Sequence, residues 1–63
     1  MNLCDFQQGD MVLITEVLDN RVREVGVREG MIVVIEQSGP PVLVRLKSGT
    51  KLAIRGEVYG ALV

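Results

Sequence analysis

The side chains able to do chemistry are few in this sequence, and none has the companions that a reaction centre needs. Histidine is absent, which removes the commonest general base and the commonest metal ligand. The single thiol, Cys4, has no second cysteine to complete a soft metal site or a disulfide. The glycines lie in separate turns and form no phosphate-binding loop. We therefore expect a protein that is not an enzyme and that carries no cofactor.

Carboxylates are the remaining candidates for metal ligands. Asp5, Asp10 and Glu36 could hold a hard cation weakly, because oxygen ligands suit such ions. Their spacing matches no ligand pattern such as an EF-hand loop. No metal site is predicted from these residues.

Charge is distributed unevenly along the chain, although the formal net charge is only −1. Residues 1–20 contain four acids and no Lys or Arg, whereas residues 45–55 contain no acid and the bases Arg45, Lys47, Lys51 and Arg55. Two interpretations stay open: the two segments complement each other within the fold, or the basic segment binds a partner. A stand-alone barrel that binds nucleic acid or another protein through this basic segment is the alternative function. Nucleic acid is not the expected partner, because the pI is near 5.2 and Phe6 and Tyr59 are the only aromatic residues.

The elements that must position these residues are short strands. With 63 residues, 48% of them hydrophobic and rich in Val and Ile, the chain predicts one all-β domain over residues 1–63. Turn residues divide it into strands at 10–17, 31–37, 42–46, 50–55 and 61–63. A bulge is expected near Thr15, and residues 56–60 are expected to form a weak turn or a single helical turn. A small barrel fits this count best, since closure would also hide the strand edges.

One short helix is expected over residues 19–26. Asp19 is a suitable N-cap, and Gly26 can take the left-handed conformation that ends a helix. Val22 and Val25 are three residues apart, which places them on one face. A helix of this length needs to dock against the barrel in order to persist.

The alternation of inward and outward side chains along each strand predicts the register of the hairpin around Gly49. A two-residue loop would pair Leu46 with Lys51 and bury a charge. A three-residue loop over 47–49, with Gly49 left-handed, instead pairs apolar residues inside: Leu46–Thr50, Val44–Leu52 and Val42–Ile54. This register places Arg45 opposite Lys51 outside, a like-charge pair that an acidic partner would relieve.

Two groups of outward residues are therefore candidates for protein contact. In the strand over 31–37, Val33 and Ile35 are expected inside, which leaves Ile32 and Val34 as an outward apolar stripe suited to self-association or to a partner. The second group is the basic face formed by Arg45, Lys47, Lys51 and Arg55. An ordinary solvated face is the alternative for this second group. For Arg21 and Arg55 we expect pairing with acids of the chain.

The order of these residues resembles the FeoA family across essentially the whole chain. The resemblance rests on Leu3-x-x-Phe6-x-x-Gly9, Arg21-Val22-x-Glu24-Val25-Gly26-Val27-x-x-Gly30-x-x-Val33-x-Ile35 and Gly49-Thr50-x-Leu52-Ala53-Ile54-Arg55. The family signature reads roughly L-x-x-L-x-x-G, then R-L-x-E-L-G-L-x-x-G-x-x-[IV]-x-V, then G-x-x-L-A-L-R. This sequence departs from the family after Arg55, where Gly56 and Gly60 stand in place of a fuller helical turn.

The resemblance implies a five-stranded SH3-like barrel and a role in bacterial ferrous iron uptake. FeoA-like proteins are thought to modulate FeoB, a membrane iron transporter with a cytoplasmic GTP-binding domain, through protein contact and without catalysis. The family is also associated with transition metal ions. A possible partner besides FeoB is a second copy of the chain, in a weak homo-oligomer. No apolar run approaches the roughly 18 residues of a spanning helix, so a cytoplasmic protein without membrane insertion is expected.

Overall fold

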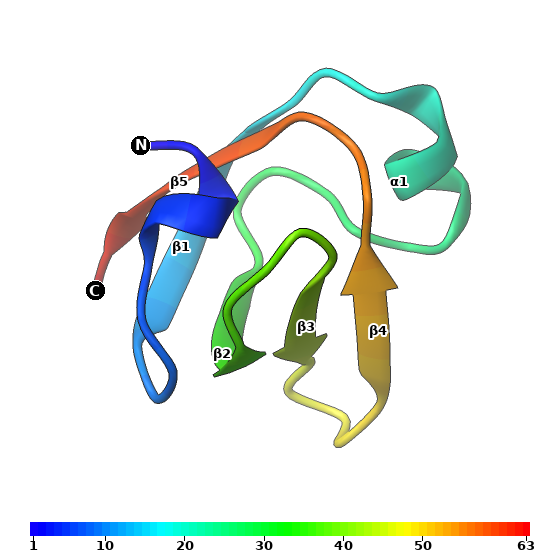
Figure 1. The fold of residues 1–63 in the computed structure, drawn as a ribbon. Coiled ribbons are helices and arrows are strands. Elements are labelled where there is room, and N and C mark those ends of the chain that lie inside the picture. Colours follow the sequence, from blue (N-terminus) through cyan, green and yellow to red (C-terminus); the bar gives the residue numbers. More distant parts are fainter.

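The computed structural model describes residues 1–63 as five antiparallel strands, one α-helix and one short 3₁₀ helix (Figure 1). In chain order the elements are η1 (Leu3–Asp5), β1 (Met11–Val17), α1 (Asn20–Glu24), β2 (Ile32–Gln37), β3 (Val42–Arg45), β4 (Lys51–Ile54) and β5 (Val58–Leu62). The predicted number of strands and the helix after the first strand are confirmed. Neither helix is long and apolar enough to cross a membrane.

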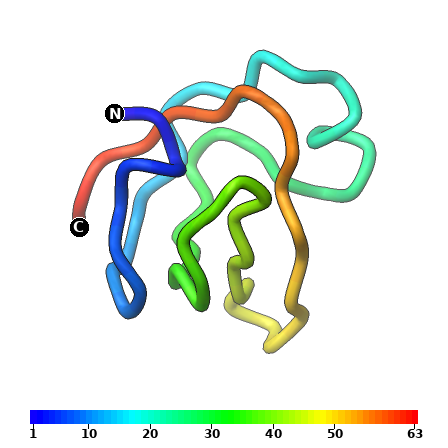
Figure 2. Tube along the Cα trace, in the orientation of Figure 1, coloured from blue at the N-terminus to red at the C-terminus, as the bar shows by residue number.

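The strands form one curled sheet in the order β4-β3-β2-β1-β5, which confirms the SH3-like barrel. β4 and β5 are its two edges and do not pair, so the expected closure does not hide both edges. The N-terminal segment instead covers β5, as the path of the chain shows (Figure 2). Met1 and Gly60 exchange backbone hydrogen bonds of 3.0 and 2.8 Å, and Asn2 bridges to Tyr59.

The core consists of thirteen buried hydrophobic residues contributed by nearly every element. Val33 and Ile35 of β2 are fully buried, as their alternation predicted. η1 brings Leu3 and Phe6 over the same core, which explains their spacing at the start of the chain. Each such side chain contributes roughly 1.5–3 kcal/mol when removed from water, so a core that is aliphatic apart from Phe6 holds the sheet together.

The helix α1 has the predicted N-cap and the predicted left-handed Gly26, but it is shorter than the expected range of 19–26. The Asp19 carboxylate accepts a hydrogen bond from the Arg21 backbone N–H at 2.9 Å, and Gly26 has a φ of +100°. Val22 is buried against the barrel, but Val25 is 55% exposed. The expectation that these two valines share a face is wrong, because the helix ends at Glu24 and Val25 already belongs to its C-cap.

The region after Arg55 departs most from expectation. Residues 58–60, assigned to a weak turn, belong to β5, which pairs with β1 and buries Val58. Gly60 does not weaken this strand, because a Cβ at that position would collide with the Val12 side chain and lie 2.8 Å from the Leu13 carbonyl oxygen. The glycine is therefore required by close packing. The predicted bulge is confirmed, since the register of β1 against β5 shifts between Ile14 and Glu16.

A candidate protein-contact surface

The hairpin register that positions the candidate surface is the predicted one. Gly49 has a φ of +95°, and Val42, Val44 and Arg45 pair with Ile54, Leu52 and Lys51. The outward faces of four strands consequently align in a single cross-strand row. This row runs Met11, Val34, Arg45, Lys51.

A second row adds to the apolar part of this face. Leu13 pairs with Ile32 on one side and with Ala61 on the other. Met11, Ile32 and Leu13 are 50%, 42% and 37% exposed, which is high for large apolar side chains in adjacent strands. The sequence prediction named Ile32 and Val34 but missed their neighbours in β1. The signal was the apolar run of residues 11–14, which fills both faces of the strand.

An open hollow of about 890 Å³ lies over this face. It joins the apolar and the basic candidates, since its lining includes Ile32, Val34, Arg45 and Lys47. Lys51 stands at the end of the cross-strand row, whereas Arg55 lies at the other end of β4, beside α1. The structure thus brings four of the six predicted contact residues together and separates Arg55 from them. We call the surface formed by Met11, Leu13, Ile32, Val34, Arg45 and Lys47 the outer face.

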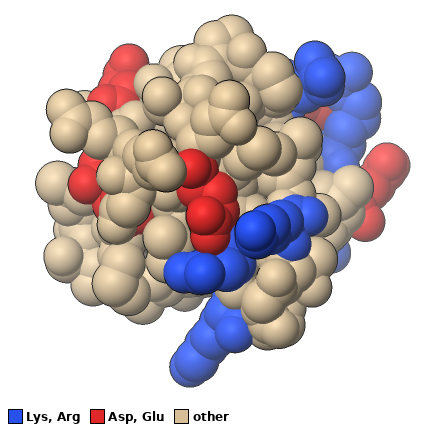
Figure 3. Space-filling view, turned by 60° about the horizontal axis from the view of Figure 1, so that its bottom comes forward, with Lys and Arg blue, Asp and Glu red and all other residues tan.

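The electrostatics of the outer face differ from expectation in one respect. The Glu36 carboxylate lies 3.2 Å from Arg45 Nε, so the chain itself supplies a negative charge beside the Arg45–Lys51 pair. Like-charge repulsion is therefore a weaker reason for an acidic partner than the sequence indicated. On the face drawn in Figure 3, acidic side chains likewise lie directly beside basic ones.

The acids of residues 1–20 do not neutralise the basic segment by direct pairing. The ion pairs of the structure are Arg21–Asp19, Arg23–Glu29 and Arg45–Glu36. The predicted pairing of Arg21 is confirmed: its guanidinium lies 2.8 Å from Asp19 and lowers the pKa of that carboxyl through a side-chain hydrogen bond. Lys47, Lys51 and Arg55 have no ion-pair partner, so the expected pairing of Arg55 is not found.

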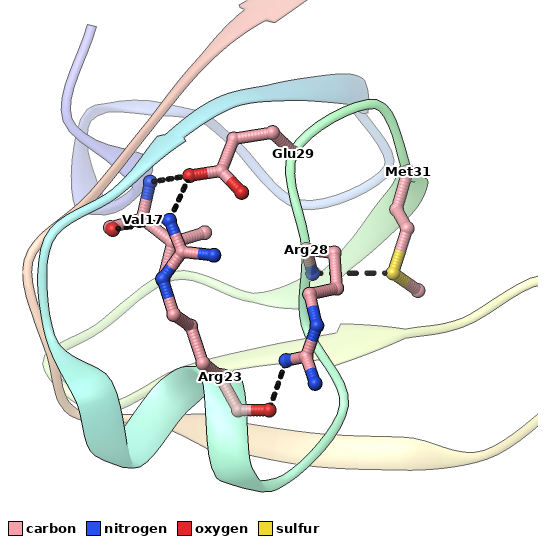
Figure 4. A network of polar contacts seen from close by, with 5 residues as sticks. All are labelled: Val17, Arg23, Arg28, Glu29 and Met31. Atoms are coloured by element: carbon pink, nitrogen blue, oxygen red, sulfur yellow. Dashed lines mark hydrogen bonds and ion pairs between the residues drawn. The ribbon is translucent and has the colours of Figure 1, made fainter.

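A polar network that sequence reasoning missed connects α1 to the barrel (Figure 4). Glu29 accepts hydrogen bonds from the Val17 backbone N–H at 3.1 Å and from the Arg23 guanidinium. Arg23 also donates to the Val17 carbonyl at 3.2 Å, and Arg28 donates to the Arg23 carbonyl. Backbone N–H donors, first that of Glu29 itself and then that of Val17, lower the pKa of Glu29. No spacing in the sequence indicated this network, because its members come from three different segments.

The residues first considered for chemistry lie apart from one another. Cys4 is exposed and its thiol donates to Asn2 Oδ1 at 3.0 Å. No group of three or more His, Cys, Asp or Glu side chains is placed to hold a metal ion. The most extensive surface feature of this small barrel is therefore the mixed apolar and basic outer face.

Comparison with known proteins identifies the family. The FeoA domain model matches residues 1–62, and the chain belongs to this family, which is non-catalytic and associated with ferrous iron uptake. A crystal structure described as the iron uptake regulatory protein FeoA superposes with a TM-score of 0.79 at 20% identity. The match covers 97% of this chain and 93% of that one, and it shows the shared fold. No curated protein sequence matches the chain.

Proposed function

We propose that this chain is a single-domain accessory protein of bacterial ferrous iron uptake that acts in the cytoplasm by contact with the cytoplasmic part of the FeoB transporter. Family membership supports the iron-uptake setting. Ferrous iron is the cargo of that system and has no assigned ligands in this chain.

The observation that carries the proposal is the composition of the outer face. Apolar side chains of β1 and β2 lie beside Arg45 and Lys47 around one hollow. Apolar contact supplies affinity when water is excluded, and adjacent charges set orientation and partner choice. The same apolar rows support weak self-association, because a second copy could cover them.

A binding measurement with the purified cytoplasmic region of FeoB tests this proposal. Ile32→Ser and the double change Arg45→Glu with Lys47→Glu should each weaken binding by about tenfold or more, the equivalent of about 1.4 kcal/mol. Leu18→Ser is the matched control, since Leu18 is 51% exposed but lies outside the outer face. Binding that survives both outer-face changes would contradict the proposal.

A further inference from the structure

The edge of β4 presents backbone groups that no other part of the chain uses. The Leu46 N–H donates to the Thr50 carbonyl at 2.8 Å, which fixes the phase of the β3–β4 ladder. Hydrogen-bonded and non-hydrogen-bonded pairs alternate in antiparallel sheets, so Leu52 and Ile54 bond to β3. Lys51 and Ala53 therefore direct their N–H and C=O groups away from the sheet, and Arg55 continues the alternation.

The two edges of the sheet are treated differently by the fold. Met1 and Asn2 cover β5, but β3 is the only strand that pairs with β4, at the right of the sheet in Figure 1. No turn, loop or cap hydrogen bond involves the backbone of Lys51, Ala53 or Arg55. All three residues are exposed. An uncovered edge of this kind is a template for pairing with another strand.

Charge decides which strand fits this edge. Lys51 and Arg55 flank Ala53 on the outward side of the sheet, and neither has an ion-pair partner. An antiparallel second copy centred on Ala53 would place Lys51 opposite Arg55, and like charges directly opposite oppose pairing. A strand with carboxylates four residues apart and a small residue midway would place opposite charges across the edge instead.

A shallow groove extends this edge toward α1. Its lining includes Val25, Ala53 and Arg55, and the exposed Val25 side chain gives it an apolar wall. An apolar side chain next to one of the carboxylates would be received there. The edge thus combines free backbone hydrogen-bonding groups, two positive charges four residues apart and an adjacent apolar groove.

We propose that the β4 edge binds an extended acidic segment of a partner protein as an additional strand of the sheet. Main-chain hydrogen bonds to Lys51 and Ala53 supply the register, and carboxylates facing Lys51 and Arg55 supply specificity. The site is distinct from the hollow of the outer face. It goes beyond the proposed function, because it does not depend on which protein carries the segment.

The first test uses a synthetic peptide of about nine residues, with Val and Thr at most positions, Glu at two positions four apart and Ala midway between them. Amide hydrogen exchange measured by NMR should slow on peptide addition at Lys51 and Ala53. The amides of Leu52 and Ile54, already bonded to β3, should change little. Slowing at both sets or at neither would overturn the proposal.

Two peptide controls separate strand addition from simple charge attraction. Methylation of a peptide N–H that faces β4 removes one ladder bond and should weaken binding by about tenfold, whereas methylation of the next N–H, which faces solvent, should leave it unchanged. A peptide with Lys in place of both Glu residues should not bind. Equal affinity of the two methylated peptides would refute backbone hydrogen bonding between the peptide and β4.

A charge exchange in the protein completes the test without altering the core. The double change Lys51→Glu with Arg55→Glu should lose the Glu peptide and gain the Lys peptide, with the same pattern of slowed exchange. Failure to bind the Lys peptide would contradict the assignment of these two side chains. If amide exchange at Lys51 and Ala53 became slower with increasing protein concentration in the absence of peptide, the occupant would be a second copy of the chain. That result would overturn the proposal.

Discussion

Glu29 shows how one carboxylate can join segments that are far apart in the sequence. It lies in the connection between α1 and β2, and it binds the backbone of β1 and the guanidinium of Arg23 in α1. The ionised Glu29 carboxylate is the acceptor in both of these bonds, which makes them stronger than neutral hydrogen bonds. The position of the short helix therefore depends on the charge state of this side chain.

The lowered pKa of Glu29 predicts a specific acid sensitivity. Because the folded state holds the pKa below its ordinary value of 4.5, the unfolded chain takes up the proton more readily. The stabilisation is complete above that value and is lost as the pH falls through the folded-state pKa. Glu29→Gln should lower the free energy of unfolding at neutral pH and flatten its decline in acid, as measured by urea denaturation at several pH values.

Glu24→Gln is the matched control for this prediction. It removes the same charge from a nearby exposed residue whose side chain has no hydrogen-bond or ion-pair partner in the structure. Its acid sensitivity should resemble that of the unmodified chain. If both variants declined alike in acid, the role assigned to Glu29 would be wrong.

Gly60 allows a sharper test at the level of one atom. Adding a Cβ by Gly60→Ala brings it against the Val12 side chain and the Leu13 carbonyl oxygen, and overpacking of this kind costs about 1–3 kcal/mol. The free energy of unfolding in urea should fall by that amount. Ala61→Ser, the exposed neighbour, should change it by no more than about 0.5 kcal/mol. An unchanged Gly60→Ala midpoint would mean that β1 and β5 can separate at low cost.

At the scale of elements, the β3–β4 hairpin is the clearest case in which local rules decide the structure. Gly49→Ala should cost about 1–2 kcal/mol, because Gly49 has a positive φ and a Cβ there meets no neighbouring atom. Gly49→Asn should recover part of the loss, since Asn tolerates this conformation better. Thermal or urea unfolding of both variants checks the order; a smaller loss for Ala than for Asn would exclude backbone conformation as the cause.

The hairpin and β5 together show what the sequence could predict and what it could not. The alternation of inward and outward side chains and a left-handed glycine determine the hairpin, and both signals lie within a segment of about ten residues. Gly60 looks like a strand breaker by the same rules, because the Val12 contact that requires it comes from the other end of the chain. The Arg45–Glu36 pair escaped prediction for a similar reason, as it joins two strands whose relative register the sequence left undetermined.

The candidate site divides in the same way. Alternation in β2 correctly placed Ile32 and Val34 outward, but it did not predict that they lie next to the basic residues of the hairpin. The contributions of Met11 and Leu13 depend on the pairing of β1 with β2, which a continuous apolar run does not specify. The position of Arg55 beside α1, away from the hollow, follows from the path of β4 across the curled sheet.

At the scale of the whole molecule, the apolar rows of the outer face predict weak self-association. Sedimentation equilibrium at high protein concentration should show a concentration-dependent mass for the unmodified chain. Ile32→Ser should abolish this dependence because it replaces a large exposed apolar side chain of these rows by a polar one, whereas Leu18→Ser should preserve it. A single monomeric mass for the unmodified chain at all concentrations would argue against self-association.

The bridge between Asn2 and Tyr59 places the tyrosine where its fluorescence and absorbance can report on the pairing of the two ends of the chain. Tyr59 is the only tyrosine, and the chain contains no tryptophan that would mask its emission. The negative charge of Glu57 raises the pKa of Tyr59, so the phenol stays protonated further into the alkaline range than a free tyrosine does. Its fluorescence and its alkaline absorbance change therefore report on a single locality, the seam where the first residues of the chain lie along the last strand.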